Sequence, residues 1–247
     1  MKYNETYDIL SVHVAVTDMN KTLSFLCDNL DELRGDYICV SNVHTTVMAY
    51  EDLNYRQIQN EAAAVLPDGK PLSVLTRKRG GFQNAAKVSG PDLMPEVFKL
   101  SKKTGYRHYF YGSTEETLEC LRNNLRKKYP YLQIAGMYAP PFQAMKKEDD
   151  EKIIQKINET HPDFLWVGLG APKQEIWMAT HKNRFPAIMI GVGAGFDFHA
   201  GMVKRAPVWM QKSGLEWLYR LSQDPKRLWK RYLITNSKFI WYILRSK

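Results

Sequence analysis

The sequence predicts an α/β fold with a mostly parallel sheet, helices on both of its faces, and a helical C-terminal appendage. Short apolar segments alternate with longer helix-like segments through the first four fifths of the 247-residue chain. This alternation is typical of βαβ units, which build parallel sheets covered by helices. After residue 201 two helix-like segments follow without a strand between them. We therefore expect an α/β domain over residues 1–201 and an appendage over residues 202–247.

The expected elements follow one another in a regular order. Apolar runs predict strands at residues 10–16, 37–40, 72–75, 109–111, 132–136, 164–167 and 187–190. Helices are expected at residues 20–33, 45–64, 91–103, 114–128, 149–158, 172–183, 207–222 and 225–244. Pro91 suits a first helical turn, Ser113 or Thr114 can cap the helix that ends at residue 128, and Asp224-Pro225 reads as a cap followed by a first-turn proline.

Two of these strands, 164–167 and 187–190, each run into a turn of small residues. The first is followed by GLGAPKQE at 168–175 and the second by GVGAGFD at 191–197. In an open parallel sheet, ligands bind at the carboxyl ends of the strands. We therefore expect these two strands to be adjacent and to form a binding site for a nucleotide or another ligand.

The excess positive charge is concentrated at the C-terminus. The chain has a formal net charge of +9, and residues 198–247 contain 11 Lys or Arg residues and two acidic residues. Four of the six tryptophans, at positions 209, 217, 229 and 241, lie in the same segment. Basic residues interleaved with aromatic residues fit either an anionic membrane surface or a nucleic acid. No apolar run has the length of roughly 18–20 residues that spans a bilayer.

Several kinds of chemistry are not favoured by the sequence. The six histidines and three cysteines show no metal-ligand spacing, and no Asp-x-Asp triplet is present. GVGAG differs from the dinucleotide fingerprint GxGxxG. The N-terminus does not resemble a signal peptide, and the odd cysteine count favours reduced thiols. We expect a cytoplasmic protein without a metal or a cofactor.

Asp68 and the pair Gly112-Ser113 each allow two interpretations. Asp68 lies in LPDGKPL, where Asp and Gly can simply form a turn. Alternatively, its carboxylate is a general base, because a sugar hydroxyl is a poor nucleophile until its proton is removed. Gly112-Ser113 joins a strand to a helix, which is an ordinary turn or a phosphate site.

Arg220, Arg227 and Arg231 are candidate cations for a departing diphosphate. Arg227 and Arg231 are four residues apart and share a helix face. The alternative is a solvated basic face. Tryptophan and tyrosine side chains surround these arginines in the sequence, which is unusual for a purely solvated helix.

Seven short blocks together resemble the TagA/WecG/CpsF family of bacterial glycosyltransferases, glycosyltransferase family 26. They are PDGKP at 67–71, VSGPDLM at 88–94, FYGS at 110–113, GLGAPKQEIW at 168–177, GVGAGFDFHAG at 191–201, KRAP at 204–207 and GLEWLYRLSQDPKRLWKRY at 214–232. The resemblance covers roughly residues 35–235.

The resemblance implies a Rossmann-like, inverting, metal-independent enzyme at the cytoplasmic face of the membrane. It would move an N-acetylmannosamine-type sugar from UDP to a sugar on a polyprenyl diphosphate, in the synthesis of teichoic acid, capsule or exopolysaccharide. Asp68 would be the general base. The C-terminal arginines would close over the diphosphate and help to hold the enzyme at the membrane. The predicted substrate-binding residues are Asn42, Thr45, Gly90, Asp92, Gly112, Ser113, Gly168, Pro172, Lys173, Gln174 and Asp197.

One departure from the family affects the donor sugar. The family often has Thr-x-Asn after the strand at 37–40, whereas this chain reads Val40-Ser41-Asn42, so the hydroxyl is lost or moved to Ser41 or Thr45. UDP-glucose or another UDP-hexose is therefore an alternative donor. A different class, a nucleic-acid-binding module that uses the basic tail, would leave Asp68 and the triplet at 173–175 unexplained, so we expect no nucleic acid as a partner. A homo-oligomer is possible.

Overall fold

The computed structural model describes residues 1–141, 143 and 145–246, with the side chain of Arg227 excepted. A six-stranded sheet has the order β4-β3-β8-β7-β5-β6, and every neighbouring pair is parallel. Its strands are β3 (Tyr37–Ser41), β4 (Ala64–Pro67), β5 (Arg107–Gly112), β6 (Gln133–Tyr138), β7 (Phe164–Gly168) and β8 (Ile188–Gly191). The predicted α/β fold with a mostly parallel sheet is confirmed, and β7 and β8 are adjacent as expected.

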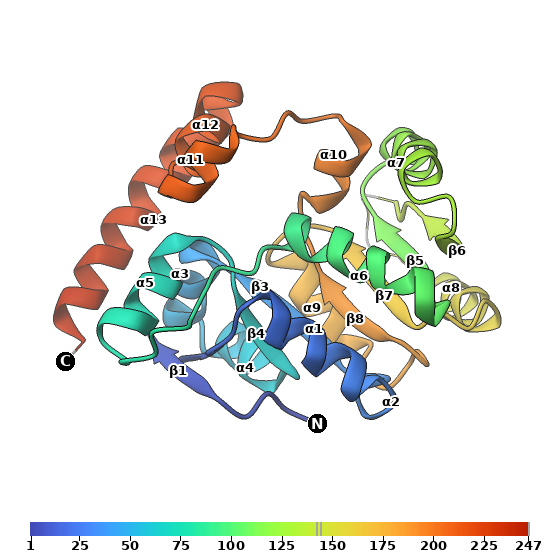
Figure 1. Cartoon of the computed structure of the whole chain (residues 1–247), viewed down its shortest axis with the longest axis horizontal. Helices are drawn as coiled ribbons and strands as arrows, with labels where there is room; N and C mark the ends of the chain where they lie inside the picture. The colour runs from blue at the N-terminus through green and yellow to red at the C-terminus, as the bar shows by residue number, and fades with distance from the viewer. Residues whose placement is uncertain (142, 144, 247) are drawn as a thin grey trace.

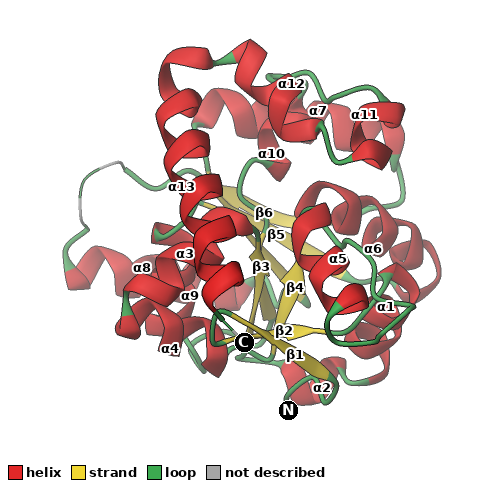
Figure 2. Ribbon diagram, turned by 90° about the vertical axis from the view of Figure 1, so that its left-hand side faces the viewer, coloured by secondary structure: helices red, strands yellow, loops and turns green. Residues whose placement is uncertain are grey.

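Helices cover both faces of the sheet and create two hydrophobic cores (Figures 1 and 2). The first core contains residues of α1 (Met19–Asp28), α2 (Leu30–Leu33), α6 (Gly90–Thr104), α7 (Glu115–Lys128) and α10 (Gly195–Ala200). The second contains residues of α3 (Val43–Glu51), α4 (Leu53–Glu61), α5 (Lys70–Lys78), α8 (Lys147–Glu159) and α9 (Lys173–Thr180).

The central strand β7 shows why the sheet is buried on both sides. Phe164 and Trp166 belong to the first core, while Leu165 and Val167 belong to the second. Such strands read as continuous apolar runs because neither face meets water. The indole N–H of Trp166 donates to Nδ1 of buried His108 at 3.1 Å, so the polar atom is not left unpaired.

Several local predictions were wrong. Residues 72–75 are not a strand, since they lie in α5, where Leu72 and Thr76 are buried one helical turn apart and Pro71 occupies the first turn. The expected helix 45–64 is divided by Asp52, which caps α4, and its last residue already belongs to β4. The expected strand 10–16 is shorter, because β1 (Thr6–Ile9) and β2 (Val12–Ala15) form an antiparallel hairpin.

The C-terminal segment is helical, as predicted. It contains α11 (Val208–Ser213), α12 (Glu216–Gln223) and α13 (Pro225–Arg245), and Figure 1 shows α13 as a long helix along one side of the molecule. The single helix expected at 207–222 is broken at Gly214, which has a φ of +79°. The part of α13 near Phe239 packs into the second core. In the described part of the chain, no helix combines the length and the hydropathy that a bilayer span needs. The division at residues 201 and 202 stays a prediction.

Candidate active site

The carboxyl edge of the sheet brings together residues from separate sequence motifs. Asn42 follows β3, Asp68 follows β4, Ser113 follows β5 and Gly168 ends β7. These strands are parallel, so their carboxyl ends lie along one edge. The ligand site predicted from the sequence therefore corresponds to one continuous region of the fold.

Asp68 is held by its backbone and leaves its carboxylate unbonded. Its N–H donates to the Ser41 carbonyl at 2.7 Å, and Gly69, with a φ of +93°, starts α5 without a side-chain cap. Within the described residues, no donor forms a hydrogen bond to the Asp68 carboxylate. Burial raises the pKa of Asp68 to about 6, an effect that nearby Lys87 opposes. The side chain thus stabilises neither a turn nor a helix cap.

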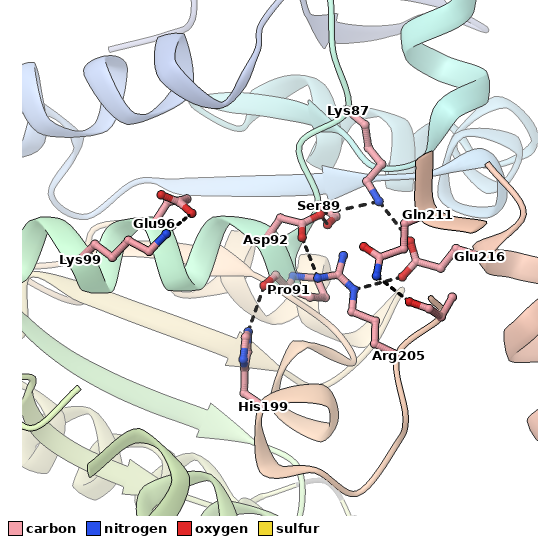
Figure 3. Close-up of polar contacts among 11 residues, drawn as sticks. Lys87, Ser89, Pro91, Asp92, Glu96, Lys99, His199, Arg205, Gln211 and Glu216 are labelled. Atoms are coloured by element: carbon pink, nitrogen blue, oxygen red, sulfur yellow. Dashed lines mark hydrogen bonds and ion pairs between the residues drawn. The ribbon is translucent and has the colours of Figure 1, made fainter. Parts of the chain in front are cut away.

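Two other carboxylates near Asp68 are held in ion pairs (Figure 3). Lys87 Nζ lies 3.1 Å from Glu216 Oε2 and 3.6 Å from Asp92 Oδ2. Arg205 Nη1 lies 2.6 Å from Asp92 Oδ1, and its Nε lies 3.3 Å from Glu216 Oε1. Each of these carboxylates therefore contacts two cations, and the network connects α6 to α12. Of the three, only Asp68 is available to take a proton from a ligand.

The protonation of Asp92 follows from the same contacts. Burial alone would raise its pKa, but hydrogen bonds from Arg205 and Ser89 hold the pKa of Asp92 below its ordinary value. Asp92 is therefore an ionised anchor for Arg205, whereas Asp68 has a pKa close to the range in which a base can both accept and release a proton.

Two predicted arginines present cationic groups to this region. Arg220 makes no ion pair with any described carboxylate, and its Cζ lies 5.5 Å over the ring of Phe198. Arg231 lies near His44, whose pKa is lowered by burial and by this guanidinium. Its buried Nε has no partner among the described groups. Both guanidiniums thus keep donors for an anion. The side chain of Arg227 lies outside the described residues.

The Gln174 side chain holds the GVGAG turn that follows β8. The side chain is buried; its Nε2 donates to Glu175 Oε1 at 2.6 Å, and its Oε1 accepts from the Gly193 N–H at 3.0 Å. Glu175 is buried as well, and burial raises its pKa. Gln174 therefore connects α9 to the GVGAG turn, and its amide is oriented by the carboxylate beside it.

Asn42 and Thr45 form the N-terminal capping box of α3. Asn42 Oδ1 accepts from the backbone N–H of Thr45, and the Thr45 hydroxyl accepts from the Asn42 N–H at 2.8 Å. The Ser41 hydroxyl is buried and lies 2.9 Å from that of Thr45. Both hydroxyls are therefore engaged inside the protein, and the Asn42 amide nitrogen is the group of this set best placed to meet a ligand.

The predicted glycines allow close packing at the edge. A Cβ at Gly112 would lie 2.6 Å from the carbonyl carbon of Gly168, and a Cβ at Gly90 would lie 2.9 Å from the Val192 Cα. The Ser113 N–H donates to the Gly168 carbonyl, so it is already used. The remaining predicted residues are Pro172 and exposed Lys173 at the start of α9, and Asp197 in α10.

The sequence prediction missed Lys87, Arg205 and Glu216 as members of the site. Each lies inside or beside a recognised block. The ion pair between Lys87 and Glu216, however, joins positions 129 residues apart. Charge alternation alone does not predict such a contact. No group of three or more metal-ligating side chains occurs among residues 1–141, 143 and 145–246.

An open parallel sheet with an unpaired carboxylate and arginines at its carboxyl edge is typical of α/β enzymes that bind their ligands at that edge. Similarity to known proteins specifies the class further. The chain belongs to the glycosyl transferase WecG/TagA/CpsF family, whose model matches residues 7–247. Family membership favours the enzyme interpretation of the basic C-terminus over a nucleic-acid-binding module.

Two relatives are named N-acetylglucosaminyldiphosphoundecaprenol N-acetyl-beta-D-mannosaminyltransferase. The chain is 31% identical to the protein of Bacillus subtilis (strain 168) over 205 residues, which cover 83% of this chain and 77% of that protein. It is 31% identical to the protein of Staphylococcus aureus (strain MW2) over 193 residues, which cover 78% and 74% of the two chains.

Proposed function

We propose that the protein transfers N-acetylmannosamine, or a related hexose, from a UDP-sugar to a saccharide linked to polyprenyl diphosphate. The names of the relatives support this acceptor and this sugar. The observation that carries the proposal is the carboxylate of Asp68, which lies unbonded at the sheet edge near two ion-paired carboxylates. The product would enter a bacterial surface polysaccharide such as teichoic acid.

The geometry supports a single displacement. Asp68 takes the proton of the acceptor hydroxyl as its oxygen forms the new bond to the anomeric carbon. The bond between that carbon and the diphosphate oxygen breaks, and UDP leaves with the electron pair. Arg220 and Arg231 offer planar donor groups to the negative charge that develops on the leaving diphosphate. The configuration at the anomeric carbon inverts.

We further propose that residues 202–247 place the enzyme on the inner face of the plasma membrane. Trp209, Trp229 and Trp241 are exposed on these helices, in a segment with nine more basic than acidic residues. Exposed aromatic side chains and lysines suit the headgroup region of an anionic membrane. Because α12 also contacts Asp92 and Lys87 through the ion-pair network, the appendage helps to close the site.

The donor is tested with a panel of UDP-sugars. Purified protein is incubated with each UDP-sugar and an N-acetylglucosaminyl diphosphate acceptor, and the product is identified by mass. We expect UDP-N-acetylmannosamine to give the highest kcat/KM. A higher value with UDP-glucose would keep the reaction type and change the donor, whereas no transfer from any UDP-sugar would reject the proposed function.

A further inference from the structure

α12 presents two chemically different faces. Glu216, Arg220 and Gln223 lie on one face: Glu216 pairs with Lys87, Arg220 stacks on a ring of α10, and Gln223 donates to the Lys204 carbonyl at 2.9 Å. Residues three or four positions apart share a helix face. The ion pairs and the hydrogen bond therefore fix the orientation of α12 and direct its opposite face away from the reacting groups.

That opposite face lines an apolar groove with a volume of about 460 Å³. The groove is lined by Met210 of α11, by Leu218, Tyr219, Leu221 and Ser222 of α12, and by Pro225 at the start of α13. Leu218 is 44% exposed, and Trp209 on α11 is 62% exposed. The groove is thus open to solvent and continues into exposed apolar surface.

We propose that this groove binds the first isoprene units of the acceptor's polyprenyl chain, an inference that rests on the proposed function. The acceptor joins a sugar, a diphosphate and a hydrocarbon chain in that order. Asp68 lies near Glu216 and Arg220 of α12, so with the sugar hydroxyl at Asp68 the acceptor's diphosphate and then its chain begin on the catalytic side of α12. An α-helix is only about 10 Å across, so a chain that passes over α12 reaches the groove directly.

The size of the groove favours a single chain over a protein partner. Small-molecule sites have volumes of roughly 300–1,000 Å³, a range that includes this groove. A stable protein interface needs about 800 Å² from each partner, far more than six lining residues supply. The appendage also carries basic side chains outside α12, and these suit the diphosphate end of the same amphipathic ligand.

The test compares two acceptors that differ only in the hydrocarbon. Both carry the same sugar diphosphate, one with a farnesyl group and one with a methyl group, and the assay contains neither membrane nor detergent. We expect the wild-type KM for the farnesyl acceptor to be at least about tenfold lower, because burial of several methylene groups favours binding. Ser222→Trp fills the groove and is expected to remove most of this difference, with the donor KM unchanged.

Ser237→Trp is the matched control, since Ser237 is also an exposed serine of the appendage and lies outside the groove. It is expected to keep the preference for farnesyl. Leu218→Ser is a second variant of the groove lining. Because Leu218 is exposed, this change leaves the hydrophobic cores intact. Equal KM values for the two acceptors in the wild type would overturn the inference while leaving the transferase function in place.

Two other results would overturn the inference because they would assign the groove to a different occupant. If Ser222→Trp weakened vesicle binding without changing either acceptor KM, the groove would hold a bilayer lipid. If it changed the sedimentation coefficient and neither KM, the groove would hold a second copy. Absence of transfer to both acceptors by the wild type would instead reject the proposed function.

Discussion

Replacing Asp68 with Asn is expected to increase stability and to lower turnover strongly. Burial raises the pKa of this carboxyl from 3.8 to about 6. At about 1.4 kcal/mol for each pKa unit, ionised Asp68 costs on the order of 3 kcal/mol in the folded state. Asn carries no charge, so Asp68→Asn removes this cost at pH 7.5, while loss of a general base lowers turnover by about 10²–10⁴-fold.

The size of this stability gain depends on pH in a defined way. The folded protein binds the Asp68 proton more tightly than the unfolded chain, so the contribution of Asp68 to stability decreases as pH rises from about 4 to about 6. The stability difference between Asp68→Asn and wild type is therefore expected to be largest above pH 6 and to vanish below pH 4. In the wild type, kcat/KM is expected to fall about tenfold for each pH unit below 6.

Urea unfolding at pH 7.5 and at pH 4, together with turnover, measures both effects. Asp52→Asn is the control, because Asp52 is an exposed cap of α4 whose two hydrogen bonds Asn can also accept. It is expected to keep stability and turnover. If Asp68→Asn were less stable than wild type at pH 7.5, the carboxylate would have a structural role, and near-normal turnover would remove Asp68 from the mechanism.

Three further predictions concern the supporting residues, the metal and the membrane. Glu175→Leu removes the acceptor that orients Gln174, so we expect the KM for the donor to rise about tenfold. Glu175→Gln keeps an acceptor, so the KM for the donor is expected to stay within about twofold of the wild-type value. Equal effects of the two changes would contradict this role of Glu175. Transfer is expected to survive EDTA, and restoration of a lost activity by Mg²⁺ or Mn²⁺ would show that the reaction needs a metal. Binding to anionic vesicles is expected to weaken as salt increases, since each basic residue near the surface contributes roughly 1 kcal/mol; salt-independent binding in a sedimentation assay would assign it to the apolar side chains alone.

The parallel sheet could be predicted because most of its strands have strong local signals. The apolar run of β7 identifies a buried strand from the sequence alone, and the glycine turn after it marks the edge at which a ligand is expected. The prediction of a strand at residues 72–75 failed because a short apolar run fits a strand or one turn of a buried helix equally well. The adjacent Pro71 was the signal for the helix.

The candidate site could be predicted only in part, for a related reason. Asp68 and Arg220 lie in short motifs that can be recognised in isolation. The role of Lys87 depends on Glu216, a residue from the other end of the chain, and folding alone brings the two together. The engagement of the Thr45 hydroxyl in a capping box likewise depends on where α3 begins, which the sequence prediction placed two residues too late.

The proposed mechanism is a single displacement at the carboxyl edge with Asp68 as the base. The most direct measurement is the configuration of the new glycosidic bond, from the NMR coupling between the carbon and the proton at the anomeric position of the purified product. With a UDP-α-sugar as donor, we predict a β-linked product, because one displacement inverts the centre. An α-linked product would contradict this mechanism, since a double displacement with retention needs a nucleophilic carboxylate besides the base, and the other two carboxylates near Asp68 are held in ion pairs.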